Sequence, residues 1–352
     1  MPGEKYYYGL NMKFWKLTLI TILSALFVYL FLKRIDFHEI KKIWLAIPPL
    51  VPLLFLLLSI PQFYVRAYRW GLLLNPFKKN IAISSLLNFT LIGFMISYLL
   101  PGRMGEIVRP VMLAEKEKIK KSQAIATIIN ERLFDLLIVL VMLIAYLILG
   151  LGTPSPILLK LKTLALLLLP MVLLIFFIIT LANTDKFFPK TERFIRFLAK
   201  ALPARWREKA ISFAVHFIKA LNLNLGWSGI LKVSCFSILH WFIILFSYWL
   251  LMQGFSGLAL DLPATIPFLA VIFVSAAIPT PGMAGSLDLA SKYALTGLFG
   301  VNARIAVAFT ILFHFLLLLM PIVLGLFAFW REGLNFKIIT RMSKKDELPS
   351  MR

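Results

Sequence analysis

Long apolar runs dominate this sequence and constrain its fold more than any other feature. A transmembrane helix needs about 20 mainly apolar residues, and each of these runs meets that length. With 60% hydrophobic residues and a mean hydropathy of +0.87, the chain cannot form a soluble domain with a polar exterior. The predicted spans are residues 14–32, 48–70, 122–150, 158–182, 228–254 and 303–330.

Two further apolar segments are interrupted by proline and glycine. Segment 81–113 contains PGRMGE, and segment 262–300 contains PTPGMAGS. Each is predicted to be a re-entrant hairpin of two short helices. The predicted fold class is therefore an all-α polytopic membrane protein, with about six full transmembrane helices and two re-entrant broken-helix hairpins in an inverted repeat.

Charge placement indicates how these segments cross the membrane. The formal net charge is +22, and Lys and Arg beside apolar runs mark the cytoplasmic side and attract anionic headgroups rather than nucleic acid. The basic connections 66–80 and 114–121 are predicted to be cytoplasmic, and the uncharged connection 150–157 to be outside. Segment 81–113 then begins and ends on the same side. The same reasoning places both termini in the cytoplasm.

The order of the segments repeats along the chain. Residues 1–352 are predicted to form a single integral domain of the cytoplasmic (plasma) membrane, in which 14–150 and 158–330 are repeats of opposite orientation. Paired broken helices in inverted repeats are typical of secondary transporters. Between the repeats, the connection 185–222 is basic and amphipathic, and it is predicted to lie along the cytoplasmic leaflet.

Charged residues in the first interrupted segment indicate a binding site. Arg103, Glu106 and Arg109 follow at three-residue intervals. A backbone break at membrane depth is tolerated only inside protein or beside a water-filled cavity, and intramembrane charges usually face such a cavity. On a helix Glu106 can pair with either arginine, which leaves one guanidinium without a carboxylate. That guanidinium, with the amides of the helix that begins after Pro101-Gly102, suits a phosphate.

The motif NERLFD opens the next span and is predicted to join this site. Glu131 and Asp135 lie four residues apart on one helix face, and Arg132 lies three residues before Asp135. The two carboxylates are predicted to hold Arg103 or Arg109 in position.

The second interrupted segment carries charges that approximately mirror the first set. Asp288 and Lys292 lie four residues apart, just after the break at Pro281-Gly282. They are predicted either to join the substrate site or to form an exposed outer pair.

PGRMGE, NERLFD and PTPGMAGSLD together resemble the flippase-like family of the lysylphosphatidylglycerol synthase transmembrane region, which also forms the N-terminal half of the multiple peptide resistance factor. Arg69-Trp70 resembles the family's Arg-Trp at the end of an early span. The sequence departs from the family pattern at Met283, where a glycine is usual, and at Asp288, where a glutamate is usual. The resemblance covers nearly the whole chain and implies movement of an anionic phospholipid, an aminoacyl-phospholipid or a polyprenyl-phosphate-linked lipid between leaflets. The predicted substrate-binding residues are Arg103, Glu106, Arg109, Glu131, Arg132, Asp135, Pro281, Gly282, Asp288 and Lys292.

Other interpretations of these residues remain. Arg103 and Glu106 can form a salt bridge at a helix end with snorkelling side chains, and NERLFD can form an interfacial structural network. The alternative functions are a membrane-embedded transferase that acts on lipid-phosphate substrates and a lipid-binding assembly protein that transports nothing. Because the connection 185–222 is too short and too basic for a nucleotide-sugar domain, no enzyme is predicted.

The expected partners are membrane lipids, anionic or phosphate-bearing, and not nucleic acid. No cofactor and no metal site is predicted, because His38, His216, His240 and His314 are scattered without ligand spacing. The single cysteine, Cys235, lies in an apolar run and is predicted to be a small buried residue.

Overall fold

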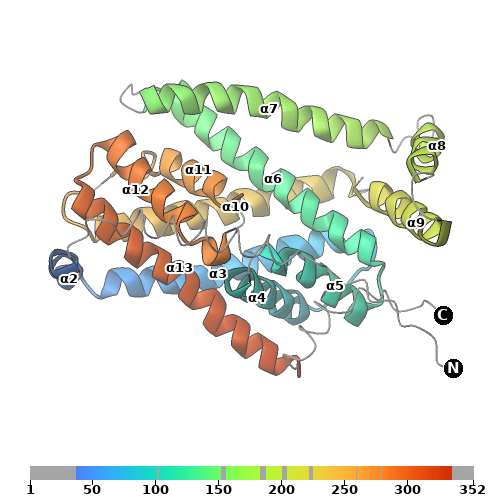
Figure 1. The fold of residues 1–352 in the computed structure, drawn as a ribbon, viewed down its shortest axis with the longest axis horizontal. Coiled ribbons are helices and arrows are strands. Elements are labelled where there is room, and N and C mark those ends of the chain that lie inside the picture. The colour runs from blue at the N-terminus through green and yellow to red at the C-terminus, as the bar shows by residue number, and fades with distance from the viewer. Residues whose placement is uncertain are drawn as a thin grey trace.

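The structure, a computed structural model, describes residues 37–100, 103–151, 156–182, 188–199, 204–221, 225–258, 260–278 and 280–334. Regular structure within these residues is entirely helical (Figure 1), as predicted. The predicted span 14–32 lies outside the described residues. The helices are α2 Phe37–Leu45, α3 Leu50–Leu74, α4 Ile83–Leu99, α5 Gly105–Glu117, α6 Lys121–Ile148, α7 Pro156–Ala182, α8 Phe188–Ala199, α9 Ala204–Leu221, α10 Gly226–Gln253, α11 Thr265–Ser275, α12 Ser286–Phe299 and α13 Ala303–Arg331, and the 3-10 turn η2 covers Pro281–Met283.

Long apolar helices make the chain an integral membrane protein. Among the described residues, four helices, α3, α7, α10 and α13, contain stretches that are long and apolar enough to cross a membrane by length and composition. Each corresponds to a predicted span. Helix α6, which corresponds to the predicted span 122–150, is 28 residues long and carries Glu131, Arg132 and Asp135 near its middle.

Helix α3 is longer than predicted and carries two buried arginines. It ends at Leu74, because the apolar residues after Trp70 continue the helix for another turn. Arg66 and Arg69 therefore lie inside the helix and are 5% and 0% exposed. The predicted connection 66–80 therefore begins too early, since the helix continues to Leu74.

Cys235 is also misplaced by the sequence prediction. It is exposed on α10, where it shares one face with the exposed side chains of Leu231 and Ile238. These residues are spaced for a single helical stripe, and an apolar run in a membrane protein can face lipid as well as the core. Its predicted burial is wrong for this reason.

Helices α4 and α5 form the first interrupted segment, which returns to the end of the bundle where it began. Lys78, before α4, donates hydrogen bonds from Nζ to the carboxylate of Glu117 at 2.8 Å and to its main-chain carbonyl at 2.9 Å. The helices touch through glycine, because a Cβ on Gly105 would overlap the carbonyl oxygen of Gly93. The second glycine of PGRMGE thus permits this close approach of two backbones.

The second interrupted segment, α11, η2 and α12, returns in the same way at the opposite end of α13. A Cβ on Gly257, before α11, would lie 3.0 Å from Cδ1 of Ile305 at the start of α13. At the far end of α13, Glu332 accepts hydrogen bonds from Nζ of Lys116 on α5 and Nδ2 of Asn88 on α4, both at 2.7 Å. The two hairpins therefore enter from opposite ends of α13. The inverted repeat itself stays a prediction.

Cysteine labelling checks this arrangement of the first hairpin. In a Cys235→Ala background, cysteines at the exposed positions 79 and 118 are expected to react with a membrane-impermeant maleimide from the same side, because Lys78 and Glu117 are bonded to each other. A cysteine at the exposed Leu151, at the far end of α6, serves as the control for the other side. Reaction of positions 79 and 118 from opposite sides would show that α4 and α5 together cross the membrane once and do not form a re-entrant hairpin.

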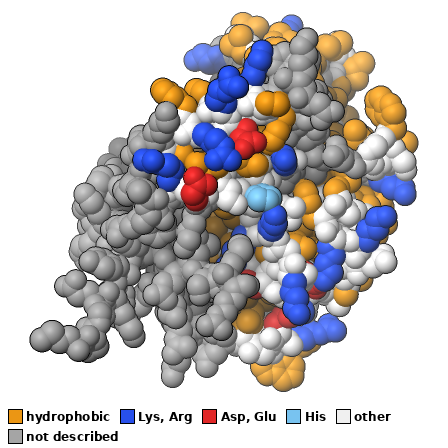
Figure 2. Space-filling model, turned by 90° about the vertical axis from the view of Figure 1, so that its right-hand side faces the viewer, with side chains coloured by type: hydrophobic (Ala, Val, Ile, Leu, Met, Phe, Trp, Pro, Cys, Tyr) orange, Lys and Arg blue, Asp and Glu red, His pale blue; other side chains and the backbone are white. Residues whose placement is uncertain are grey.

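The basic connection forms two helices, α8 and α9. Phe194 and Phe197 of α8 are exposed, and α9 lies beside α6, with Nε2 of His216 2.6 Å from Nζ of Lys120. Figure 2 shows this end of the molecule, where Lys and Arg side chains are spread among hydrophobic ones and prevail over acidic side chains. Such a surface suits the interface with anionic headgroups.

Candidate functional site

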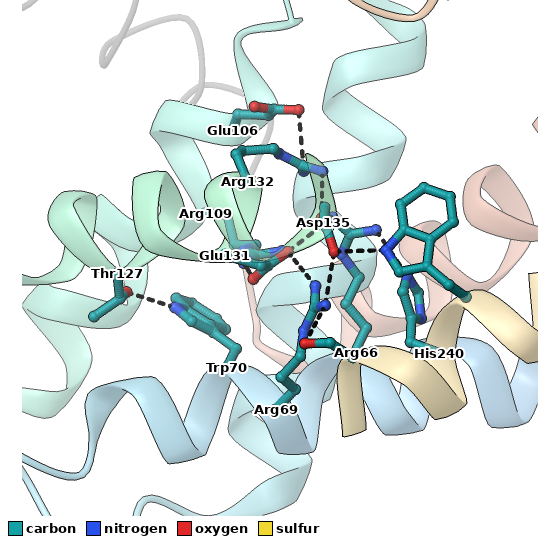
Figure 3. Close-up of polar contacts among 12 residues, drawn as sticks. Arg66, Arg69, Trp70, Glu106, Arg109, Thr127, Glu131, Arg132, Asp135 and His240 are labelled. Carbon is teal, nitrogen blue, oxygen red and sulfur yellow. Dashed lines mark hydrogen bonds and ion pairs between the residues drawn. The ribbon is translucent and has the colours of Figure 1, made fainter. Parts of the chain in front are cut away.

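Helices α3, α5 and α6 meet at a buried group of charged side chains, here called the charge cluster (Figure 3). Its members are Arg66 and Arg69 of α3, Arg109 of α5, and Glu131 and Asp135 of α6, and all five are buried. Buried charges are costly unless they are paired and hydrogen-bonded. The contacts of the two carboxylates therefore decide whether the cluster is stable.

Glu131 is shared by three arginines. Its Oε1 lies 2.7 Å from Nη2 of Arg66 and 3.5 Å from Nη2 of Arg69. Its Oε2 lies 2.6 Å from Nη2 of Arg109, whose guanidinium stacks 4.2 Å from the ring centroid of Trp70. Of the two arginines that Glu131 was predicted to hold, the structure brings Arg109 to it.

Asp135 lies one helical turn further along α6 and closes the cluster on its other side. Nη1 of Arg69 and Nε1 of Trp241 donate to Oδ1 at 2.7 and 3.0 Å. Nη1 of Arg132 donates to Oδ2 at 3.2 Å, and Nη2 of Arg66 lies 3.6 Å from the same oxygen. Three of the four carboxylate oxygens thus face cationic or N–H groups from two residues, and Oε2 of Glu131 faces Arg109.

Arg103, Glu106 and Arg132 form the accessible edge of the cluster, with side chains that are 28%, 31% and 30% exposed. Oε1 of Glu106 lies 3.4 Å from Nη1 of Arg103 and 3.1 Å from Nη2 of Arg132, so one carboxylate serves two guanidinium groups. A small pocket opens beside this edge. It is lined by polar and small residues that include Gly93, Ser97, Gly105, Glu106, Arg109 and Arg132.

The cluster and its edge carry excess positive charge. Five arginines face three carboxylates, and five minus three leaves two positive charges among these described residues. The three buried arginines share the carboxylates of Glu131 and Asp135. At the edge, Arg103 and Arg132 share Glu106, and Arg132 also reaches Asp135. One of the two excess charges therefore lies at the accessible edge, where an anion can approach it.

The two interrupted segments meet at this edge. Nη2 of Arg103, in the first break, lies 3.8 Å from Sδ of Met283, in the second. Arg103 and Met283 both adopt left-handed backbone conformations, with φ of 54° and 58°, which cost about 1–2 kcal/mol for residues with a side chain. Backbone strain of this kind is concentrated at functional sites. Pro101 and Gly102 lie outside the described residues.

Asp288 is held by a histidine rather than by Lys292. Its Oδ1 lies 2.7 Å from Nδ1 of His314 on α13, and its Oδ2 accepts from the main-chain N–H of Gly285 at 2.8 Å. Asp288 is buried, so the predicted exposed outer pair with Lys292 is wrong. The hairpin turns Asp288 inward against α13, and Lys292 forms no ion pair with any described residue.

The break at Pro281-Gly282 becomes η2, and its backbone also contacts His314. Pro281 begins the turn, and Gly282 has a φ of 58°, which glycine adopts without steric cost. The carbonyl oxygen of Gly282 lies 2.8 Å from Nε2 of His314. Neither Asp288 nor Lys292 forms an ion pair with the charge cluster within the part of the chain that the structure describes.

Sequence reasoning missed four polar residues of these sites. Arg66 and Arg69 were counted as basic residues at the cytoplasmic end of the span 48–70 and not as members of a site, although the apolar residues after Trp70 were a signal that the helix continues beyond them. His240 and His314 were considered only as metal ligands. An ionisable residue within an apolar span is itself a signal of a functional site. His240 illustrates this, because its Nε2 lies 3.5 Å from Nη1 of Arg66.

Comparison with known proteins places these residues in a family. A family model described as the lysylphosphatidylglycerol synthase TM region matches residues 14–325. The chain belongs to this family. It is also 21% identical over 325 residues to a UPF0104 membrane protein of Methanocaldococcus jannaschii, an alignment that covers 91% of this chain and 96% of that protein. No solved structure matches the chain.

Membership of the lysylphosphatidylglycerol synthase TM-region family gives the protein a membrane and lipid context. The matched residues include the charge cluster, its accessible edge and the pair Asp288–His314. The arginine-rich edge, where the two broken helices meet, therefore lies within the region that matches this lipid-related membrane family. Arginine recognises phosphate through paired hydrogen bonds, which is the chemistry that most lipid headgroups offer.

Proposed function

We propose that the protein moves an anionic phospholipid, or a related lipid with a phosphate-bearing headgroup, between the leaflets of the membrane. The observation that carries this proposal is the accessible edge, where Arg103 and Arg132 share the single carboxylate of Glu106. Two broken helices converge there, and such convergence is typical of substrate sites in transporters.

The edge suggests how a headgroup phosphate is exchanged. A phosphate that enters beside Arg103 and Arg132 replaces Glu106 as their common partner, since both ligands offer anionic oxygens to the same guanidinium groups. Arg109 lies behind the pocket and stays paired with Glu131 at 2.6 Å. The charge cluster then serves as a rigid support that orients the edge, and Glu106 acts as the exchangeable group.

Reconstitution tests the proposal directly. Purified protein in liposomes is given fluorescent phosphatidylglycerol, phosphatidylcholine or a glycosyl diacylglycerol without phosphate, and exchange between leaflets is followed by dithionite quenching. We expect phosphatidylglycerol to exchange fastest and the phosphate-free lipid to exchange at the rate of empty liposomes. Equal rates for all three lipids, or no exchange at all, would refute it. Formation of a new lipid product would favour the transferase alternative.

Glu106→Gln tests the exchange of partners at the edge. Removing the competing carboxylate is expected to tighten binding of short-chain phosphatidylglycerol about threefold to fivefold, since a partly exposed ion pair contributes at most about 1 kcal/mol. Binding is measured by calorimetry in detergent. The matched control is Glu115→Gln on the same helix, whose pair with Lys121 is not in contact with the edge. Unchanged or weaker binding by Glu106→Gln contradicts the competition.

A further inference from the structure

A second buried polar group lies where the interrupted segments meet, and the lipid site does not use it. Asp288 of α12 and His314 of α13 are both buried. The imidazole bridges two acceptors: Nδ1 is 2.7 Å from Oδ1 of Asp288, and Nε2 is 2.8 Å from the carbonyl oxygen of Gly282.

The geometry of these bonds fixes how many protons the pair holds. A carbonyl oxygen can only accept, so Nε2 of His314 must carry a proton. The contact between Nδ1 and Asp288 needs a second proton, which resides either on the imidazole or on the carboxyl group. In both cases the pair is protonated and has no net charge. A neutral imidazole beside an ionised carboxylate would leave one of the two bonds unmade.

The buried surroundings of Asp288 and His314 make loss of this proton costly. From the neighbouring elements, the titratable or charged residues whose contacts reach this region are Tyr98 of α4, Arg103 of the first break and Tyr248 of α10, and Lys292 lies one turn after Asp288 on α12. The carbonyl oxygen of Tyr98 lies beside Gly282, Tyr248 packs on Phe313, and α3 contributes the ring of Phe55. Loss of the proton would leave a negative charge in a buried site, which is costly.

We propose that Asp288 and His314 form a proton-binding site that couples lipid movement to a proton gradient, an inference that rests on the proposed function. When the pair loses its proton, His314 keeps only one of its two bonds. Release of Gly282 frees η2, and the next residue, Met283, touches Arg103. The contacts therefore run from the proton site to the phosphate-binding edge through two adjacent residues of η2.

A pH gradient across liposomes provides the test. With the voltage clamped by valinomycin and potassium, a gradient of about two pH units can sustain up to about a hundredfold difference of phosphatidylglycerol between leaflets if one proton moves per lipid. We expect the wild-type protein to build such an asymmetry. His314→Gln and Asp288→Asn are expected to exchange the lipid only to equal distribution.

The chain offers a matched control between the same two helices. Oγ of Ser291 and Oγ1 of Thr310 form a buried hydrogen bond of 2.7 Å between α12 and α13, one turn from the proton site, and neither residue titrates. Thr310→Val is expected to accumulate lipid as the wild type does. Accumulation by His314→Gln equal to that of the wild type overturns the proposal, as does loss of accumulation in Thr310→Val to the same extent.

A measurement that needs no transport separates this inference from the proposed function. The chain has four histidines, so nitrogen NMR of histidine-labelled protein in nanodiscs can identify His314 by the signal missing in His314→Gln. Carbon NMR of the Asp288 carboxyl group, identified by the signal missing in Asp288→Asn, follows the other place where the proton can reside. We expect either the ring or the carboxyl group to lose one proton as the pH rises. A pair in which neither the ring nor the carboxyl group changes its protonation overturns the proton site even if the lipid exchanges. Normal titration without lipid exchange would instead refute the proposed function.

Discussion

Glu131→Gln is expected to lower the free energy of unfolding by about 3–5 kcal/mol, the range for breaking a buried ion pair from one side. The side chain is fully buried and has Arg66, Arg69 and Arg109 as its partners. A glutamine keeps the shape but not the charge, and its amide N–H groups cannot accept from guanidinium groups. Three cations would then share the single charge of Asp135. Unfolding in mixed detergent micelles, followed by circular dichroism, measures the change.

The control for this prediction is a glutamate whose ion pair is exposed. Glu115 lies 2.7 Å from Nζ of Lys121, with side chains that are 43% and 27% exposed, and Glu115→Gln is expected to change the free energy of unfolding by less than about 1 kcal/mol. If both variants unfold at the same detergent concentration, the charge cluster does not support the fold in the way described.

Arg103→Ala is expected to abolish lipid exchange, and Arg103→Lys to slow it about tenfold or more. A lysine keeps the charge but not the planar fork that binds two phosphate oxygens at once, and tenfold corresponds to about 1.4 kcal/mol, near the lower end for a hydrogen bond to a charged group. Folding is expected to change little, because Arg103 is partly exposed and its contact with Glu106 is long, at 3.4 Å. Exchange of phosphatidylglycerol in liposomes is the measurement.

Arg304→Lys is the matched control for that comparison. Arg304 is 72% exposed and pairs with Glu39 at 2.6 Å, at the end of α13 far from Glu332. Its replacement is expected to leave the exchange rate unchanged. If Arg103→Lys also exchanges lipid at the wild-type rate, Arg103 is only an anchor that snorkels to the interface, since lysine performs that role equally well.

The helical architecture could be predicted from the sequence because it follows from local pattern. Apolar runs fixed the long helices to within a few residues, and proline with glycine located both hairpins. The end of α3 could not be located in this way, since arginine usually marks the edge of a span. The packing of α5, α6 and α10 around Arg66 and Arg69 makes their burial possible. That packing is not a local property.

The site was predictable only where its contacts are local. Three-residue spacing on a helix anticipates the contacts of Arg103 with Glu106 and of Arg132 with Asp135, at 3.4 and 3.2 Å. The bonds of Arg69 to Asp135 and of Asp288 to His314 join helices that are distant in sequence. For Asp288 the local pattern was misleading. Its four-residue spacing favoured Lys292 as the partner, whereas tertiary packing places His314 beside it.

The left-handed backbone at Met283 limits which residues evolution can place there. Glycine occupies such a conformation without penalty, Asn and Asp with a small one, and β-branched residues are strongly disfavoured. An unbranched chain such as methionine is tolerated only if its contacts offset the strain, and its thioether gains one with Arg103. Among related sequences, position 283 should therefore alternate between glycine and long flexible side chains, with valine, isoleucine and threonine absent.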